Sequence, residues 1–579
     1  TYVLGLQEAV VVAMADGFSR ASGKLSACNV HVAPGLGNAM GSLFNAKWFG
    51  SPVLVTAGQQ EQGHGLTEPQ LYDPLIPIAS PMVKWAVEVN RAQDLPRIVR
   101  RAAKIALTPP TGPVFISLPG DILKDHISMD MGHPTRIDAV NRPSDSALEK
   151  LAKRILEANR PLIIAGHELS LREALDEASK FAELLGTPVY QQTVPYTAQF
   201  LSEHTTFMGA LSRIQSQVSS ILKDYDLLIC LGSDVLRMSV WNVADPLPDG
   251  MPVIQIGERD WELGKNYHAE IAIKADIKET LNALLPVLKG MINNERKADF
   301  KYRVSELKTR NWNTKRKKLI NDARKKIHQV PIDPQVLMMY ISEILPKNAV
   351  LVEECLTTSK SLLGFYPFRD ARCYYGLASG GIGFAIAGAI GIHLAQPERP
   401  LVALIGDGSS LYNIQALWTA VHLKLPLTYI IANNKGYRIL KDRLLEFQGS
   451  DNYIGMNFHE PEIDFVNLAK SFGMNGYRIT HPEEIRPTLQ MCIIDNNGPN
   501  LIEVMIDEGL SNMKRKAQNI EEKLQTIDKY INFISKDNDV YMSDVAVLKL
   551  KEMDYEDELI NINRHLNNAE TFKKTDLIG

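Results

Sequence analysis

The chain of 579 residues has few cysteines, and they form none of the patterns that mark a zinc site or a disulfide framework. Five cysteines are scattered along the sequence, without a CxxC pair or a Cys/His cluster. Both kinds of site are therefore excluded as a basis for the fold. Scattered cysteines favour a reducing compartment, so we expect a cytoplasmic protein. The positions are Cys28, Cys230, Cys355, Cys373 and Cys492.

A strong excess of one charge is also absent. Lys and Arg number 63 against 67 Asp and Glu, so the net charge is −4 and gives no general attraction to nucleic acid. The local exception is the basic stretch 291–330. A patch for a polyanion is one interpretation, but a solvated linker helix is the more common explanation for such a run. We therefore expect no nucleic-acid partner.

Long apolar runs are rare, and no stretch reads as a signal peptide. Residues 377–395 contain five glycines and a histidine, which predicts a buried, closely packed helix rather than a membrane span. We expect no membrane association. The chain opens with TYVLGLQEAV, without Met and in mid-domain. We interpret this opening as the start of a fragment that lacks N-terminal residues.

Short apolar runs bounded by glycine and proline alternate with helix-like segments over most of the chain. Examples are PVLVTAG, PLIIAG and PLVALIGD. Strands that alternate with helices predict parallel sheets, and the length suggests three or four domains. The expected fold is α/β, with three doubly wound parallel-sheet domains. We expect domains at 1–125, 144–290 and 331–508, a basic linker at 291–330 and a helical tail of unknown role at 509–579.

The most informative motif is the tripeptide Gly-Asp-Gly at 406–408, followed by two asparagines at 433–434. The tripeptide alone is common in turns. Here an apolar strand ends on it, a helix is expected at 411–423, and a second apolar strand ends on the asparagines. Neighbouring parallel strands would bring Asp407 and Asn434 together at their carboxyl ends, where open α/β sheets bind ligands.

The residue types at this edge indicate a cation and a phosphate. A carboxylate from Asp407, an amide oxygen from Asn434 and a nearby backbone carbonyl suit Mg²⁺. Gly408 allows close approach of a phosphate, and Ser409 and Ser410 at a helix start add donors. A dinucleotide site fits less well, because GDGSSL lacks the third glycine of GxGxxG.

With this spacing the chain resembles thiamine-diphosphate-dependent decarboxylases of the benzoylformate decarboxylase group, within the wider acetolactate synthase-like family. The resemblance covers most of residues 1–508 and implies the fold of thiamine-diphosphate enzymes. The matching segments are LQEAVVVAMADGFSRASG, NVHVAPGLGNAMG, TAGQQ, PVFISLP, LASGGIGFAIAGAIG and GDGSSLYNIQALWTA through IIANNKGY.

The resemblance implies two cofactors, thiamine diphosphate and Mg²⁺. The metal would be held by Asp407, Asn434 and the backbone oxygen of Gly436. Gly380 would accept a hydrogen bond from the aminopyrimidine, and Ile382 would lie under the cofactor and bend it. The remaining cofactor-binding positions are Gly408, Ser409, Thr357, Thr358 and Tyr437.

Two residues near the start of the chain are the implied catalytic groups. Glu8 would donate a proton to N1′ of the aminopyrimidine, although a lone glutamate at a helix start is more often explained by the helix dipole. His31 would handle the substrate carboxylate and move protons, because imidazole titrates near neutral pH. A lone histidine is otherwise more often a hydrogen-bonded core residue.

The sequence departs from the family pattern at two places. The first active-site serine of the group would lie upstream of Thr1, and Ser239 stands near the position of an expected second histidine. In the substrate pocket, direct alignment places Ile439 and Arg443 where the group leaves room for a phenyl ring. The bulk of Ile439 predicts a preference for short aliphatic or carboxylated 2-oxo acids.

The resemblance implies non-oxidative decarboxylation of a 2-oxo acid to an aldehyde and CO₂. The alternatives are a carboligase of the acetolactate synthase type and a non-catalytic relative that binds the cofactor. The His31 segment HVAPGLGN favours the decarboxylase. The family also implies a homodimer or homotetramer with active sites between chains.

Overall fold

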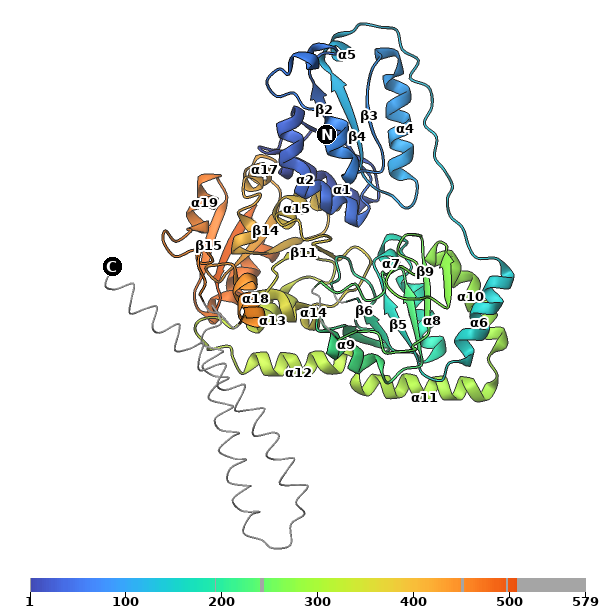
Figure 1. Cartoon of the computed structure of the whole chain (residues 1–579). Helices are drawn as coiled ribbons and strands as arrows, with labels where there is room; N and C mark the ends of the chain where they lie inside the picture. Colours follow the sequence, from blue (N-terminus) through green and yellow to red (C-terminus); the bar gives the residue numbers. More distant parts are fainter. Residues whose placement is uncertain (1, 193, 240–243, 449–451, 496–497, 508–579) are drawn as a thin grey trace.

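Three parallel β-sheets, each flanked by helices, form the described part of the chain (Figure 1). The computed structural model describes residues 2–192, 194–239, 244–448, 452–495 and 498–507. The predicted α/β class with three parallel-sheet domains is confirmed. The expected tail at 509–579 lies outside the described residues. No helix in the described ranges combines the length and apolar character needed to cross a membrane.

The first sheet has four strands in the order β1-β2-β4-β3. Its two central strands, β2 and β4, are almost wholly buried because helices cover both faces of the sheet. Its elements are α1 (Glu8–Ser22), β1 (Ser26–Val30), α2 (Val32–Phe49), β2 (Val53–Gln59), α3 (Leu75–Ala79), β3 (Ala86–Glu88), α4 (Leu95–Leu107), β4 (Val114–Pro119) and α5 (Gly120–Lys124).

The second sheet has six strands in the order β10-β9-β8-β5-β6-β7. Ser144 caps the first helix by accepting a hydrogen bond from the Ala147 nitrogen, and serine is a favoured residue at this position. The elements are α6 (Asp145–Glu157), β5 (Pro161–Ala165), α7 (Glu168–Leu171), α8 (Leu175–Leu185), β6 (Val189–Gln191), β7 (Phe207–Ala210), α9 (Gln215–Leu222), β8 (Leu227–Leu231), β9 (Val253–Gly257), β10 (Ile271–Lys274) and α10 (Ile277–Met291).

The basic stretch forms two helices, α11 (Asn294–Arg310) and α12 (Trp312–Arg324), which run beneath the second and third domains (Figure 1). Some of its basic side chains form hydrogen bonds to the neighbouring domain. Arg316 donates hydrogen bonds to the Phe365 carbonyl and to Ser342. Such contacts favour the interpretation as a linker over a patch for a polyanion.

The third sheet also has six strands, in the order β12-β11-β13-β14-β16-β15. Its elements up to β14, the strand that ends on the asparagines, are α13 (Pro334–Ile344), β11 (Val350–Glu354), α14 (Leu362–Phe365), β12 (Tyr374–Gly376), α15 (Phe384–Ala395), β13 (Leu401–Gly406), α16 (Asp407–Ser410), α17 (Ala416–His422) and β14 (Leu427–Asn433). The chain then forms α18 (Arg438–Gln448), α19 (Phe465–Ser471), β15 (Asn475–Ile479), α20 (Ile485–Leu489) and β16 (Asn500–Met505).

Two helices of this domain are shorter than the sequence predicts. The apolar run 377–395 is helical only from Phe384, because Gly380 and Gly383 adopt φ values of +93° and +99°. Of the helix expected at 411–423 only α17 forms, and the single turn α16 precedes that range. Asn413 lies between them and donates from its side chain to the Gly383 carbonyl at 2.9 Å, so it braces the segment before α15 instead of continuing a helix.

The first and third domains meet where α1 crosses α15. Glycine allows the two backbones to approach closely. A Cβ atom at Gly17 would lie 2.9 Å from the Gly388 carbonyl carbon, and one at Gly391 would lie 2.7 Å from the Phe18 nitrogen. No side chain other than hydrogen fits at either position. The crossing therefore fixes α1, which begins at Glu8, against the helix that follows Ile382.

Candidate active site

The carboxyl edge of the third sheet brings the Gly-Asp-Gly motif and the asparagines together. Strands β13 and β14 are parallel neighbours, with Gly406 opposite Ala432. Asp407 is 3% exposed. Its carboxylate accepts hydrogen bonds from the Gly408 nitrogen at 2.8 Å and the Gly436 nitrogen at 3.0 Å. The aspartate therefore joins the two turns that follow the two strands.

This edge has the features of a cation site. Burial raises the pKa of Asp407 to about 6, against the opposing effect of its backbone hydrogen bonds. Asn434 is buried, and its Oδ1 atom has no hydrogen-bond partner. An unpartnered buried acceptor beside a desolvated carboxylate fits a hard cation such as Mg²⁺.

A metal at this edge would depend on few charged ligands. The described residues contain no group of three or more His, Cys, Asp or Glu side chains able to hold a metal. The predicted set uses one carboxylate, one amide and the Gly436 backbone. Gly436 is confined, because a Cβ atom there would lie 3.1 Å from Lys441 Nζ and closer still to the Met456 carbonyl.

Small and hydroxyl-bearing residues surround this edge. A Cβ atom at Gly408 would lie 2.8 Å from the ring of Tyr437, so only glycine fits there. Tyr437 is half-buried with its ring edge-on to Phe458 at 4.8 Å. Ser409 lies in the single turn α16. Gly408 and Ser409 therefore lie beside the cation edge, as a diphosphate site requires.

The two predicted threonines follow the neighbouring strand β11. Thr358 is buried and begins a short 3₁₀ helix, Thr358–Ser361, while Thr357 is half-buried directly before it. Because β11 lies next to β13, both threonines follow the strand beside the one that ends at Asp407.

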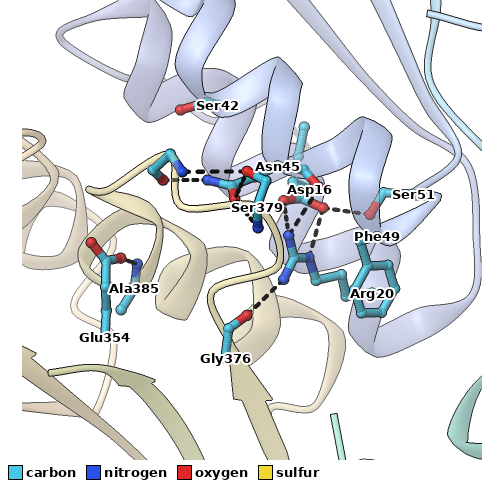
Figure 2. A network of polar contacts seen from close by, with 12 residues as sticks. Asp16, Arg20, Ser42, Asn45, Phe49, Ser51, Glu354, Gly376, Ser379 and Ala385 are labelled. Atoms are coloured by element: carbon cyan, nitrogen blue, oxygen red, sulfur yellow. Dashed lines mark hydrogen bonds and ion pairs between the residues drawn. The ribbon is translucent and has the colours of Figure 1, made fainter. Parts of the chain in front are cut away.

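Gly380 and Ile382 lie in the segment 376–383, which runs from the last residue of β12 to the residue before α15 and is irregular from 377 on. Gly380 is exposed, and a Cβ atom there would meet nothing within 4 Å. Ile382 is half-buried. Glu354, at the end of β11, accepts hydrogen bonds from the nitrogens of Gly383 and Ala385 (Figure 2). These two hydrogen bonds fix the end of the segment where it joins α15.

In the first domain, Glu8 and His31 converge on one glycine. Glu8 is half-buried at the start of α1, and His31 immediately precedes α2 with an exposed side chain. A Cβ atom at Gly35 would lie 2.8 Å from Glu8 Oε1 and 3.2 Å from the His31 Cβ. Asn38, one turn further along α2, donates to Glu8 Oε2 at 3.2 Å. The Glu8 carboxylate and the base of the His31 side chain thus both lie beside Gly35.

The residues predicted for the substrate pocket are spread over two domains. Ile439 and Arg443 lie in α18, directly after the Asn434 turn, and both are half-buried. Ser239 is exposed in the segment after β8 of the central domain. Their part in a pocket stays a prediction.

Several polar residues of this region were not identified from the sequence. Asn38 holds Glu8, Glu354 and Asn413 hold the start of α15, and Asn45 bonds to the 376–383 segment. For Asn38 and Asn45 a signal existed, since both are amides in an otherwise small and apolar helix. For Glu354 no pattern distinguished it from the adjacent Glu353.

All three domains match one enzyme family. The N-terminal TPP binding domain of the thiamine pyrophosphate enzymes matches residues 1–72, the central domain matches residues 148–284, and the C-terminal TPP binding domain matches residues 357–504. Over 508 residues the chain is 30% identical to benzoylformate decarboxylase of Pseudomonas aeruginosa, covering 87% of this chain and 91% of that protein. The chain belongs to the thiamine pyrophosphate enzymes.

Other relatives and solved structures show the same family. A probable acetolactate synthase large subunit of Methanocaldococcus jannaschii is 27% identical over 529 residues, covering 87% of this chain and 85% of that protein. The 4-hydroxybenzoylformate decarboxylase of Rhodococcus jostii RHA1 superposes with a TM-score of 0.76 at 28% identity, covering 87% and 92% of the two chains. Benzoylformate decarboxylase of Polynucleobacter necessarius gives 0.76 at 28% identity, with 88% and 92% covered.

The local chemistry agrees with membership of the thiamine pyrophosphate enzymes. The unpartnered Asn434 oxygen beside Asp407 fits the cation that would accompany a diphosphate. The confined glycines at 408 and 436 leave room for it where a side chain would intrude. The predicted resemblance to the benzoylformate decarboxylase group within an acetolactate synthase-like family is confirmed at the level of the family.

Proposed function

We propose that this thiamine pyrophosphate enzyme uses Mg²⁺ and thiamine diphosphate to decarboxylate a 2-oxo acid non-oxidatively to an aldehyde and CO₂. The observation that carries the proposal is the convergence of Glu8 and His31 on Gly35. This reaction needs a group that holds a proton on the cofactor and a second group that manages the carboxylate and protons of the substrate. Glu8 and His31, both beside Gly35, would supply them.

The bound cofactor would supply the carbon nucleophile and the electron sink for the departing CO₂. The chain would supply binding and proton management. Glu8 would hold a proton at N1′ of the aminopyrimidine, and His31 would bind the carboxylate and deliver a proton to the product. Gly380 would accept a hydrogen bond from the aminopyrimidine, and Ile382 would support it from below.

The third domain would bind the charged end of the cofactor. Asp407, Asn434 and the backbone oxygen of Gly436 would hold Mg²⁺, which neutralises the diphosphate. The diphosphate itself would be bound by residues that follow three neighbouring strands of the sheet, β11, β13 and β14. These residues are Thr357, Thr358, Gly408, Ser409 and Tyr437. Support for this assignment comes from the unpartnered Asn434 oxygen at the same edge.

We further propose a homodimer or homotetramer in which each active site takes Glu8 from one chain and Asp407 from another. Large apolar side chains are exposed in both of these domains. Leu6, beside Glu8, is 49% exposed, and Ile454 in the third domain is 77% exposed. Burial of such side chains is a usual source of stability for an obligate interface. Light scattering of the active enzyme tests this, and an active monomer would contradict it.

A second candidate is a carboligase, which condenses two 2-oxo acids with loss of one CO₂. The 27% identity with a probable acetolactate synthase large subunit favours keeping it. With pyruvate as sole substrate, a carboligase gives acetolactate and a decarboxylase gives acetaldehyde. A third candidate, a non-catalytic relative that only binds the cofactor, gives neither product.

The proposed substrate is a short aliphatic or carboxylated 2-oxo acid rather than benzoylformate. Ile439 is half-buried in the first turn of α18 and is stiff at χ1, so it leaves less room for a ring than alanine would. Arg443, one turn later, would attract a second carboxylate. Ser239 would take the place of the expected second histidine and lacks its acid–base chemistry.

The deciding experiment is a panel of 2-oxo acids with saturating thiamine diphosphate and Mg²⁺, with CO₂ and aldehyde measured separately. We expect aldehyde in stoichiometric amount to CO₂, and higher kcat/KM for 2-oxobutanoate or 2-oxoglutarate than for benzoylformate. Ile439→Ala should raise kcat/KM for benzoylformate about 10- to 100-fold. Absence of CO₂ release from every acid contradicts the function, and benzoylformate as the best substrate of the unaltered enzyme contradicts only the pocket argument.

We propose a cytoplasmic location for the enzyme, without a nucleic-acid or membrane partner. The five cysteines are free thiols in the structure, which suits a reducing compartment.

A further inference from the structure

We propose that Asn45 is a positioning residue that holds the segment 376–383 ready for the cofactor. The proposal rests on the proposed function, in which Gly380 and Ile382 contact the aminopyrimidine. Asn45 is 1% exposed in α2 of the first domain, whereas the segment belongs to the third domain of the same chain. The contact therefore crosses between two domains without a second copy of the chain.

A single amide group of Asn45 bonds to both neighbours of Gly380 (Figure 2). Its Oδ1 atom accepts hydrogen bonds from the Ser379 hydroxyl at 2.6 Å and from the Ser379 nitrogen at 3.2 Å. Its Nδ2 atom donates to the Gly381 carbonyl. Gly381 also precedes Ile382 directly, so Asn45 fixes the residues on either side of one cofactor position and next to the other.

The Gly381 nitrogen donates to the Ser379 hydroxyl within the segment at 3.3 Å, and the other bonds described here reach the segment at its ends. Arg20 of α1 donates to the Gly376 carbonyl at 3.0 Å and is itself held by a fully buried ion pair with Asp16 at 2.6 Å (Figure 2). At the far end Glu354 accepts from the Gly383 nitrogen. Asn45 supplies the hydrogen bonds from outside the segment to its middle residues, 379 and 381.

An amide suits this role better than any other side chain of its size. It offers an acceptor for Ser379 and a donor for Gly381 from one rigid plane. A carboxylate at the same place would keep the acceptor and repel the Gly381 carbonyl. The segment also lies directly against the helix backbone, since a Cβ atom at Gly381 would be 2.6 Å from the Gly41 carbonyl oxygen.

The consequence for binding follows from the irregular backbone of the segment. Residues 377–383 belong to no helix or strand, so these side-chain bonds order the segment before the cofactor arrives. Without them the ordering must occur during binding, which weakens affinity. Loss of a partner that orients a metal ligand typically costs about 10- to 100-fold in affinity, and we expect a loss of similar size for this segment.

The test compares Asn45→Ala with Ser42→Ala as a matched control. Ser42 is buried on the same helix, one turn earlier, and donates to the Ala9 carbonyl at 2.9 Å instead of to the segment (Figure 2). Hydrogen–deuterium exchange of the enzyme without cofactor reads the amides of 377–383, and calorimetry with Mg²⁺ present reads the Kd for thiamine diphosphate.

We expect Asn45→Ala to accelerate exchange in 377–383 and to raise the Kd about 10- to 100-fold, with turnover recovering at saturating cofactor. Ser42→Ala should change neither. Asn45→Asp should behave like Asn45→Ala, because the donation to Gly381 is lost. If Asn45→Ala does not fold, Ser379→Ala removes one hydroxyl donor from the same contact and should raise the Kd several-fold.

Two results overturn the proposal. Exchange in 377–383 that is equally fast in Asn45→Ala and Ser42→Ala would mean that the contact orders nothing. Faster exchange with an unchanged Kd would mean that the ordered segment does not matter for the cofactor. Failure of the proposed function looks different, since the unaltered enzyme would then not bind thiamine diphosphate while the exchange measurement still reports on Asn45.

Discussion

Replacing Gly391 by alanine should push α1 and α15 apart and weaken the contact between the first and third domains. At the crossing of α1 and α15, the new Cβ atom would overlap the Met14 carbonyl oxygen and would lie 2.8 Å from the carbon of that carbonyl and 2.7 Å from the Phe18 nitrogen. Carbon atoms in contact prefer about 3.5–4.0 Å, so the carbon contact alone requires the two helices to move apart by roughly 0.7 Å, and the overlap with the oxygen requires more. Since the opposing atoms are backbone, no rotamer change relieves the overlap. Overpacking of this kind costs about 1–3 kcal/mol.

The matched control is Gly290→Ala, at an exposed position near the end of α10. A Cβ atom there would meet nothing within 4 Å. The control should gain about 0.4–1 kcal/mol, because alanine restricts the unfolded chain. Differential scanning calorimetry measures the effect, because each kcal/mol of stability corresponds to about 2–4 °C in Tm for a domain of roughly 150–250 residues. A Tm of Gly391→Ala at or above that of Gly290→Ala would refute the crossing described above.

Three further predictions concern single charged groups. Asp407→Ala should weaken Mg²⁺ and thiamine diphosphate binding in parallel, because both depend on this carboxylate, and calorimetry that finds cofactor binding unaffected would remove Asp407 from the site. Glu8→Gln should keep cofactor binding but lose exchange of the cofactor's C2 hydrogen into heavy water, measured by NMR; unchanged exchange would exclude a role for Glu8. Burial raises the pKa of Glu168 from 4.5 to about 7, so the folded protein favours the neutral acid, and this stabilisation is complete below pH 4.5 and lost as the pH rises through 7. The unfolding free energy of Glu168→Gln, relative to that of the unaltered protein, should therefore rise by about 3 kcal/mol between pH 4.5 and pH 7.5. Denaturant unfolding of both proteins at both pH values measures this difference, and a difference that does not change with pH would contradict the prediction.

The fold was predictable from sequence wherever strands are fully buried. Continuous apolar runs such as those of β5, β8 and β14 have no other stable place than the middle of a parallel sheet. The edge strands β3, β12 and β15 were missed because they are short or partly exposed, so their patterns resemble loops. The start of the helix expected at 377–395 was misplaced because two glycines with positive φ interrupt an apolar run that shows no polar boundary.

The candidate site divides in the same way. Asp407 and Asn434 could be placed together because two adjacent strands fix their positions along one sheet edge. The meeting of Glu8 and His31 at Gly35 depends instead on how α1 packs on α2, and spacing in the sequence carries no information on that packing. The contacts of Asn45 were beyond prediction for a stronger reason. Its partners, Ser379 and Gly381, lie more than 330 positions away and in another domain.

Helices α1 and α2 therefore have a different role at each end. At their starts they carry Glu8 and His31, the groups proposed to act on a cofactor. At their last turns they carry Arg20 and Asn45, which hold the 376–383 segment of the same chain. A helix of 15 residues, the length of α1, spans about 22 Å and is rigid over that distance. In the proposed assembly the first pair faces one active site and the second pair supports another. A displacement at the α1–α15 crossing would accordingly disturb both sites at once, so we expect substitution of Gly17 or Gly391 to affect function as well as packing.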